Sequence, residues 1–487
     1  MKSVREITGS TEVLQTWGDD SLPVASLTCD SRCVTRGSCF FAVRGTTADG
    51  HDHIPQAVAS GAVCVVCEHL PEQRADGVCY VVTPDSAEAA GRMASAFYDH
   101  PSRELKLIGV TGTNGKTTTA TLLYDLFRAL GYEAGLLSTV VYRIGSRSVE
   151  STHTTPDAIR LNAMLREMAD SGCEYCFMEC SSHAIVQRRI AGLHFAGGIF
   201  TNLTHDHLDY HKTFSEYLRA KKMFFDTLPR EAFALVNTDD RNGTVMVQNT
   251  RAAVHTLSLR SPADFRCKVV EMQPDGMLLR MDGTEVWVRF AGRFNASNLL
   301  TVYSAALLAG AERDEVLRTI STLTPVRGRF EQIAADDGTI AVVDYAHTPD
   351  ALENVFRTLD ELRTGNRRLI AVCGCGGDRD RTKRPEMAAI AVKYASLAIF
   401  TSDNPRSEKP EDILREMTCQ LPSGSQFLTI ADRAEAIRTA VMLASPGDMI
   451  LIAGKGHETY QIIGSEKIHF DDREQVTMRL REFGRMK

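Results

Sequence analysis

The stretch Leu105-Lys-Leu-Ile-Gly-Val-Thr-Gly-Thr-Asn-Gly-Lys-Thr-Thr118 decides the fold of the central part of the chain. It begins as a short apolar run, typical of a buried strand, and continues into a loop that contains Gly112 and Gly115. The residues that follow, from Ala120 to Phe127, favour a helix. A buried strand, a glycine loop and a helix in this order predict a parallel α/β unit.

The loop after this strand has the chemistry of a triphosphate site. Glycines let the backbone curl so that its N–H groups point inward, and the helix N-terminus adds positive potential. Lys116 can reach the β- and γ-phosphates, and the Thr117 hydroxyl can bind Mg²⁺. Val110 stands where the standard phosphate loop has its first glycine, so we expect a tighter loop. The predicted ATP contacts here are Gly112, Thr113, Asn114, Gly115, Lys116, Thr117 and Thr118.

Strands and helices alternate along most of the chain, which predicts an α/β fold with mostly parallel sheets. A small α/β unit is expected from Val24 to Val82, followed by a helix from Ala87 to Tyr98. Alternating residues from Ala253 to Phe290 predict antiparallel hairpins before a helix near Asn295. The last part is expected to be a doubly wound, Rossmann-like sheet. Its predicted strands are Ile340–Asp344, Leu369–Cys373, Leu397–Thr401 and Met449–Ala453.

The length and composition are those of a multidomain globular protein. A chain of 487 residues is expected to form about three domains. The net charge of −7 gives no basic excess, so nucleic acid is not expected as a partner. The sequence has no stretch typical of a signal peptide or membrane span, which makes the cytoplasm the expected location. Cys173, Cys176 and Cys180 have no second spaced pair nearby, which favours buried thiols over a zinc or redox site.

Polar side chains follow two further predicted strands. Glu179 to His183 comes after one of them, and Thr201 to His211 comes after the next. The carboxyl ends of parallel strands are where such sheets bind ligands. Carboxylate, imidazole and hydroxyl groups at this edge can hold Mg²⁺ and a substrate.

Sequence elements across nearly the whole chain resemble those of one family. Beside the glycine loop they are Cys29–Arg32, His153–Pro156, Glu179–His183, Asp206–His211, Phe294–Asn298, Arg327–Glu331, Asp344–Pro349, Gly374–Arg379, Asp403–Arg406 and Gly454–Glu458. In kind and order they resemble the Mur ligases, the ATP-dependent amino-acid ligases of bacterial wall synthesis.

The resemblance implies three domains with separate tasks. Residues 1–103 would hold the UDP end of the substrate, residues 104–329 would bind ATP in a P-loop-type domain, and residues 330–487 would bring the amino acid. Further ATP contacts would be Asn298, Arg329, Asp344 and His347. Contacts with the UDP-muramoyl dipeptide would be Cys29, Ser31, Thr46, Thr47, Ala48, Thr154, Thr155, Ser181, Gln187 and Arg189.

The resemblance also implies the reaction, which extends UDP-N-acetylmuramoyl-L-alanyl-D-glutamate by one residue for peptidoglycan, cell shape and division. A carboxylate is a poor electrophile, so ATP would first convert the D-glutamate side chain to an acyl phosphate, which the amine then attacks to give ADP and phosphate. Mg²⁺ ligands would be Thr117, Glu179, His207 and a carbamylated Lys221; Lys116, Lys221 and His207 would be catalytic. Lys222 is the adjacent alternative, and the spacing from Tyr217 favours Lys221.

The presence of Arg406 predicts which amino acid the enzyme adds. meso-Diaminopimelate has a distal carboxylate that a guanidinium can bind through two hydrogen bonds, whereas L-lysine has none. The resemblance places the diaminopimelate contacts at Arg379, Asp403, Asn404, Pro405, Arg406, Gly454 and Glu458. The plainer alternative is that Arg406 braces its loop by pairing with Glu408 or Glu411.

Other functions explain less of the sequence. An L-lysine-adding ligase of the same family is the nearest alternative. A folylpolyglutamate synthase would share the ATP loop but has no reason to carry a uridine-binding domain or the Asp403–Arg406 element. A non-catalytic binding module would have to keep the loop, the metal positions and the amino-acid element without turnover. We expect a monomeric enzyme.

Overall fold

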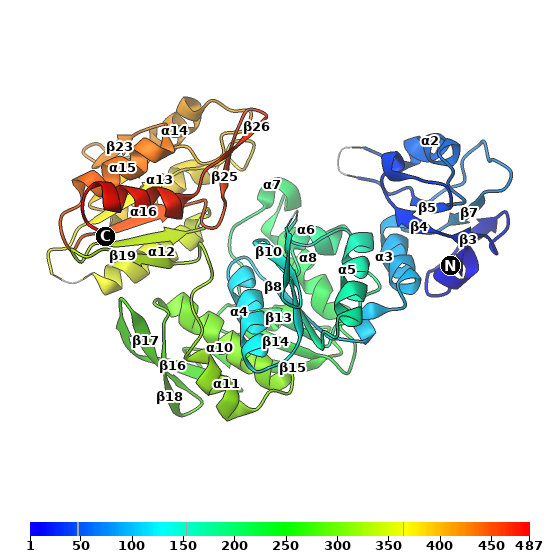
Figure 1. Cartoon of the computed structure of the whole chain (residues 1–487), viewed down its shortest axis with the longest axis horizontal. Helices are drawn as coiled ribbons and strands as arrows, with labels where there is room; N and C mark the ends of the chain where they lie inside the picture. The colour runs from blue at the N-terminus through cyan, green and yellow to red at the C-terminus, as the bar shows by residue number, and fades with distance from the viewer. Residues whose placement is uncertain (46–47, 152, 364) are drawn as a thin grey trace.

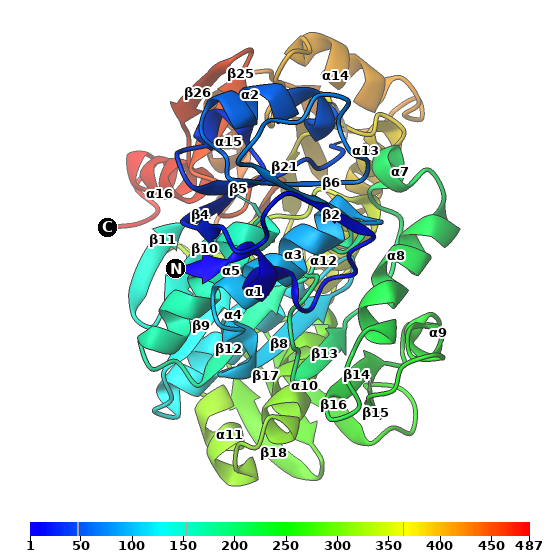
Figure 2. The same ribbon diagram turned by 90° about the vertical axis from the view of Figure 1, so that its right-hand side faces the viewer.

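The computed structural model describes residues 1–45, 48–151, 153–363 and 365–487. Three α/β units follow one another along the chain, coloured blue, cyan to green, and yellow to red in Figure 1. The first and last units both lie above the central one, and the view turned by 90° in Figure 2 shows the same arrangement. The predicted α/β fold with three units is confirmed.

The N-terminal unit contains a five-stranded sheet. Its order is β2 (Gln15–Trp17), β7 (Cys79–Val82), β6 (Cys64–Cys67), β5 (Ser38–Phe41) and β4 (Ser26–Thr28), parallel except for β2. One face packs on α1 (Val4–Thr8) and α3 (Ser86–Phe97), and the other packs on α2 (Ile54–Ala59). A short pair, β1 (Lys2–Ser3) with β3 (Pro23–Val24), flanks it.

The central unit contains an eleven-stranded sheet. Its order is β11 (Arg147–Glu150), β10 (Val141–Ile144), β9 (Ala134–Leu137), β12 (Tyr175–Glu179), β8 (Lys106–Thr111), β13 (Gly197–Phe200), β14 (Phe233–Asn237), β15 (Ala253–Ser258), β16 (Phe265–Gln273), β17 (Gly276–Met281) and β18 (Thr284–Val288). The run from β9 to β16 is parallel. The prediction of antiparallel hairpins from Ala253 to Phe290 is wrong for its first strand. β15 continues the parallel sheet beside β14, and only β16 to β18 form the predicted antiparallel hairpins.

Helices cover both faces of the central sheet. On one face lie α4 (Lys116–Ala129), α10 (Arg293–Leu308) and α11 (Arg313–Ile320), which share a core with β8. On the other lie α5 (Ala158–Asp170), α6 (Ser182–Val186) and α8 (Phe214–Asp226). The short helices α7 (Leu208–His211) and α9 (Gly243–Met246) complete the unit. This double cover explains why the central strands are apolar throughout.

The C-terminal unit is the predicted doubly wound sheet. Its order is β19 (Glu331–Ala334), β20 (Ile340–Asp344), β24 (Met449–Ala453), β21 (Leu369–Cys373), β22 (Leu397–Phe400) and β23 (Phe427–Thr429), parallel except for β19. One face packs on α12 (Pro349–Leu362), α13 (Lys383–Tyr394) and α14 (Pro410–Thr418), and the other on α15 (Arg433–Leu443) and α16 (Asp472–Glu482). A hairpin of β25 (Tyr460–Ile463) and β26 (Glu466–His469) projects from it.

The cysteines are free thiols, and ten of the thirteen are buried. Cys173, Cys176 and Cys180 are among the buried ones, as predicted. Within the described ranges of the chain, no helix is both long and apolar enough to span a bilayer.

Candidate active site

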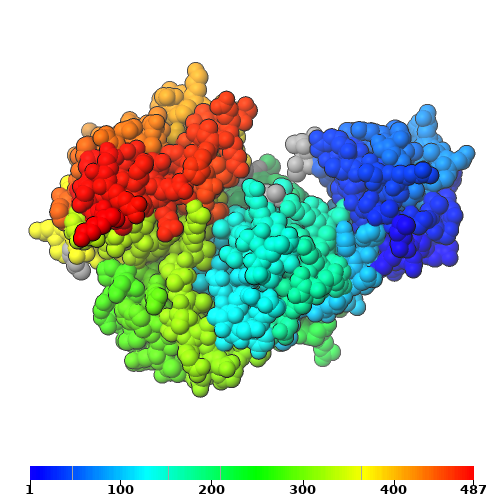
Figure 3. All heavy atoms as spheres, in the orientation of Figure 1, coloured from blue at the N-terminus to red at the C-terminus, as the bar shows by residue number. Residues whose placement is uncertain are grey.

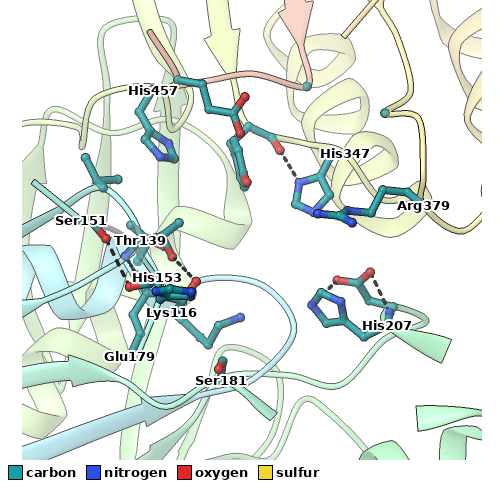
Figure 4. Close-up of a pocket in the computed structure, with 18 of the residues that line it drawn as sticks. Lys116, Thr139, Ser151, His153, Glu179, Ser181, His207, His347, Arg379 and His457 are labelled. Carbon is teal, nitrogen blue, oxygen red and sulfur yellow. Dashed lines mark hydrogen bonds and ion pairs between the residues drawn. The ribbon is translucent and has the colours of Figure 1, made fainter. Parts of the chain in front are cut away.

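A cavity of about 850 Å³ opens between the central and C-terminal units. It is lined by the loops that follow β8, β12 and β13 in the central unit and β21, β22 and β24 in the C-terminal unit. The space-filling view shows a hollow over the central unit, between the first and last units (Figure 3). In the close-up, Lys116, Glu179 and His207 lie on one side, and His347, Arg379 and His457 face them from the other (Figure 4). Parallel topology therefore gathers the predicted elements at one place.

Two glycines of the phosphate loop are required by its geometry. Gly112 and Gly115 have φ angles of 147° and 86°, which L side chains rarely adopt. A Cβ atom on Gly112 would lie 1.9 Å from Thr201 Oγ1, and one on Gly115 would lie 2.6 Å from Asn298 Oδ1. The loop is therefore packed tightly against the strand end after β13 and against helix α10.

Lys116 and Lys221 converge on the same backbone oxygen. The Gly112 carbonyl accepts hydrogen bonds from Lys116 Nζ at 2.9 Å and from Lys221 Nζ at 2.7 Å. Lys221 is 1% exposed. Burial, and secondly the charge of Lys116, hold the pKa of Lys221 well below its usual range. Burial also lowers the pKa of Lys116, so the charged forms of both lysines are disfavoured at this carbonyl.

The adjacent Lys222 points elsewhere. Its Nζ donates to Asp226 at 2.6 Å on the same helix, α8. Lys221 instead lies over the ring of Tyr217, with Nζ 4.6 Å from the ring centre. Of the two lysines, Lys221 is the one that lines the cavity.

Glu179 and His207 lie near the phosphate loop and have side-chain atoms that can bind a cation. Glu179 is 1% exposed, and its Oε1 accepts from the Thr139 N–H at 2.7 Å. Its Oε2 is buried without a hydrogen-bond partner in the described part of the chain. Burial lowers the pKa of His207 to about 3, against the opposing effect of the Asp206 carboxylate, which lies 3.3 Å from His207 Nε2; the nearby His183, Lys116 and Lys221 lower the pKa further. A carboxylate oxygen without a donor and a neutral imidazole are both able to bind a cation.

Groups of at least three His, Cys, Asp or Glu side chains arranged to hold a metal do not occur among the described residues. The predicted metal set does not need such a group. It combines one carboxylate and one imidazole with the Thr117 hydroxyl and Lys221, and Mg²⁺ typically takes only one or two protein carboxylates beside phosphate oxygens and water. The side chains present therefore fit a magnesium ion shared with a bound triphosphate.

A second cavity, of about 420 Å³, lies beside the phosphate loop. Of the predicted ATP contacts, Asn298, Arg329, Asp344 and His347 all line it. Arg329 Nη2 donates to Thr117 Oγ1 at 3.1 Å, which connects this wall to the start of α4. Burial raises the pKa of Asp344, whose two oxygens accept from the Phe330 and Ala346 N–H groups.

The candidates for the dipeptide end also line the large cavity. Arg189 donates to Gln187 Oε1 at 2.7 Å and to the Thr155 carbonyl at 2.8 Å. Ser181 caps α6, and the Thr154 hydroxyl accepts from Thr139 at 3.1 Å. These five residues thus form one polar wall beside Glu179.

The uridine candidates lie apart from both cavities. Cys29, Ser31 and Ala48 belong to the N-terminal unit, and none of them lines either cavity. The Ser31 hydroxyl is used locally, donating to Gln56 Oε1 at 3.0 Å. Thr46 and Thr47 lie outside the described residues.

The amino-acid candidates converge after β21, β22 and β24. Of the seven, Arg379, Asp403, Asn404, Arg406, Gly454 and Glu458 line the large cavity. Pro405 does not, since it is buried behind the loop, where its carbonyl accepts from the Glu408 N–H. Asp403 Oδ1 is buried without a hydrogen-bond partner among the described residues.

Arg406 is not braced by the acidic residues that offered the plainer explanation. Its Nη1 donates to the Gly377 carbonyl at 2.7 Å and lies 3.4 Å from the Asn404 carbonyl. Glu408 is occupied by Arg381 and Arg384. Within the described ranges, no ion pair joins Arg406 to a carboxylate. Pairing with Glu408 or Glu411 is therefore wrong, and the half-buried guanidinium faces the cavity.

Models of three domains match the chain, in an order that agrees with this architecture. The Mur ligase family catalytic domain matches residues 23–98, the Mur ligase middle domain matches residues 110–306, and the Mur ligase glutamate ligase domain matches residues 328–456. Together they cover most of the sequence. The chain belongs to the Mur ligase family.

Relatives of this Mur ligase match it from end to end. A protein of Phocaeicola vulgatus is 54% identical over 476 residues, 97% of this chain and 98% of the relative. One of Cytophaga hutchinsonii is 53% identical over 473 residues, 96% and 97% of the two chains. Both are named UDP-N-acetylmuramoyl-L-alanyl-D-glutamate--2,6-diaminopimelate ligase. A solved structure of that name is 32% identical, with a TM-score of 0.70, and the match covers 99% of this chain and all of that one.

Several residues of this Mur ligase's cavity were not predicted. Lys383 and Asp380 lie just after the Gly374–Arg379 element, and His457 lies inside the Gly454–Glu458 element. Their position in or next to those elements was the available signal. Lys455, in the same element as His457, is fully buried and does not line the cavity, which the sequence did not show.

Proposed function

We propose that this Mur ligase joins meso-diaminopimelate to the D-glutamate side-chain carboxylate of UDP-N-acetylmuramoyl-L-alanyl-D-glutamate, converting ATP to ADP and phosphate. One observation carries the proposal. A single cavity brings the phosphate loop together with the polar wall around Arg189 and the Asp403–Arg406 loop. The names of its relatives describe the same reaction.

The first step moves the γ-phosphoryl group of ATP to a carboxylate oxygen. An O–P bond to the dipeptide forms as the bond to ADP breaks. Lys116 neutralises charge on the phosphates, and the polar wall orients the dipeptide. Such positioning and charge stabilisation carry most of the catalysis in phosphoryl transfer. Mg²⁺, held by Thr117, Glu179, His207 and Lys221, would supply further charge neutralisation when bound.

The second step forms the amide. The amino group of diaminopimelate attacks the acyl carbon, phosphate leaves with the former carboxylate oxygen, and the nitrogen loses a proton. An enzyme nucleophile is not required, because the acyl phosphate is already activated. In support of this step, Arg379 of the C-terminal unit faces Lys116 of the phosphate loop across the cavity (Figure 4).

Lys221 is proposed to act as a carbamate. Carbon dioxide adds only to an unprotonated amine, and the lowered pKa of Lys221 supplies one. The product replaces a buried neutral amine with an anionic oxygen ligand in the cavity that Glu179 also lines. Its negative charge would attract the ammonium group of Lys116.

The remaining assignments belong to the same proposal. Residues 1–103 would hold the uridine end, with Cys29, Ser31, Thr46, Thr47 and Ala48 as contacts. Residues 104–329 would bind ATP, and residues 330–487 the amino acid. We expect a cytoplasmic monomer.

The proposal is tested by measuring phosphate release from ATP. Release should require both the UDP-muramoyl dipeptide and diaminopimelate. Release with a folate substrate, or without any amino acid, would favour the alternatives. The same assay with L-lysine separates the two possible amino acids.

Arg406→Ala should remove most of the preference for diaminopimelate over L-lysine. Losing one partner of a desolvated charge pair costs about 2 to 5 kcal/mol, and the low end applies to a half-buried group. Catalytic efficiency with diaminopimelate should fall by about tenfold or more. The measurement is kcat/KM for each amino acid, with Arg415→Ala on α14 as the matched control. An unchanged preference in Arg406→Ala, or a wild-type preference for lysine, would refute the assignment.

A further inference from the structure

Lys455 is enclosed beneath the amino-acid candidates. It follows β24, and its side chain is 0% exposed. Its Nζ lies 3.0 Å from Glu458 Oε2, 3.3 Å from Asn404 Oδ1 and 3.7 Å from Asp403 Oδ1. The ring of Tyr460 covers it, with Nζ 5.5 Å from the ring centre. Lys455 therefore touches three of the proposed diaminopimelate contacts without being open to the ligand itself.

The charges around Lys455 match one end of diaminopimelate. Asp403 and Glu458 contribute two carboxylates, and Lys455 returns one positive charge, which leaves a net single negative charge. Diaminopimelate presents one ammonium beside one carboxylate at its distal end, and Arg406 is proposed to take that carboxylate. The net charge of these three side chains thus equals and opposes the charge of the ammonium only while Lys455 is present.

We propose that Lys455 is a positioning residue that keeps Glu458 ionised and aimed, so that Asp403 and Glu458 together bind the distal ammonium of diaminopimelate. The inference rests on the proposed function. Asn404 acts with Lys455, because its Nδ2 donates to Glu458 Oε2 at 2.9 Å while its Oδ1 accepts from Lys455 and from the Ile462 N–H. Side chains from the loops after β22 and β24 are thus held in one network.

Ionised Glu458 needs this support. Burial, and secondly the charge of Asp403, raise the pKa of Glu458, whereas Lys455 and Asn404 lower it. Tyr345 and Tyr460 also face Glu458, and burial raises the pKa of both phenols, which stay neutral near neutral pH. Arg433 faces Asp403 from α15 but is paired with Asp472. Lys455 is thus the cation in direct contact with Glu458.

Lys455→Met tests the proposal, since it keeps most of the length of the side chain and removes the charge. Without Lys455 the pKa of Glu458 rises, so the acid limb of kcat/KM for diaminopimelate should move to higher pH. At pH values below both limbs the loss should be about tenfold for each unit of that movement, and it should disappear at pH values above the moved limb. KM for ATP and for the UDP-dipeptide should stay unchanged. Lys455→Arg, which keeps the charge, should keep the wild-type acid limb.

Glu458→Gln provides a second line of evidence that does not depend on how Lys455→Met folds. It should lose efficiency with diaminopimelate at every pH and show a flattened acid limb. Lys455→Met should have a smaller effect in the Glu458→Gln background than in the wild type, because the two residues act together. Lys393→Met, at an exposed lysine of α13, is the matched control.

The outcomes separate this inference from the proposed function. If the wild type does not use diaminopimelate, the proposed function fails. If the wild type uses it but Lys455→Met loses efficiency equally at all pH values, or an acid limb survives unchanged in Glu458→Gln, the role of Lys455 is overturned.

Discussion

Lys116→Ala should abolish turnover while the protein still folds. The lysine starts α4 at the phosphate loop and lines the cavity, so its removal takes away the cation that we expect to neutralise the transferred phosphoryl group. Loss of a preorganised charge of this kind costs about 10² to 10³ in kcat or more. Among the described residues, its Nζ donates to the Gly112 and Thr113 carbonyls of its own loop. Two such hydrogen bonds contribute about 1 kcal/mol each to stability.

The measurements are steady-state phosphate release and the thermal unfolding midpoint. Arg128→Ala removes a cation from the opposite end of the same helix, where it pairs with Glu133, and should remain active. Retention of more than a tenth of wild-type kcat by Lys116→Ala would show that the loop does not hold the reacting phosphates.

Lys221→Ala should be nearly inactive, and short carboxylic acids should partly restore it. The substitution removes the carbamate proposed as a metal ligand, and a small carboxylate can occupy the space left behind. We expect a loss of kcat comparable to that of Lys116→Ala, since both substitutions remove a charged group next to the same part of the phosphate loop, the Gly112 carbonyl. The matched control is Lys222→Ala. The Lys222 side chain pairs with Asp226, so we expect its removal to leave activity intact.

The carbamate itself can be observed. Protein equilibrated with ¹³C-labelled carbon dioxide should show a carbamate carbon resonance that is absent in Lys221→Ala and present in Lys222→Ala. Depletion of carbon dioxide should lower wild-type activity reversibly. Full activity in Lys221→Ala, or an active wild type without the resonance, would rule out this role.

The sequence predicted the strands of the C-terminal sheet well because each is a short apolar run between polar helices. Three predicted spans, Ile340–Asp344, Leu369–Cys373 and Met449–Ala453, agree with β20, β21 and β24. The region from Ala253 was harder, since local alternation cannot show whether a strand pairs with its chain neighbour or with β14. Pairing partners are set by the tertiary packing of the sheet.

The sequence predicted the separate segments that contribute to the site but not how their side chains pack against one another. The phosphate loop, Glu179 and Arg406 each had a local signal. Which oxygen of Glu179 lacks a donor, and which of two adjacent lysines faces Gly112, depend on how β12 and α8 pack. Lys455 was missed for the same reason, because its importance comes from complete burial between Asp403 and Glu458.

Isotope transfer can show whether the dipeptide is activated as an acyl phosphate before it is joined to diaminopimelate. The dipeptide is prepared with heavy oxygen in the D-glutamate side-chain carboxylate and incubated with enzyme, ATP and diaminopimelate. Phosphorus NMR should show one heavy oxygen in the phosphate released, and mass spectrometry should show the diaminopimelate-extended product. Heavy oxygen in AMP, pyrophosphate as the product, or unlabelled phosphate beside that product would contradict the account.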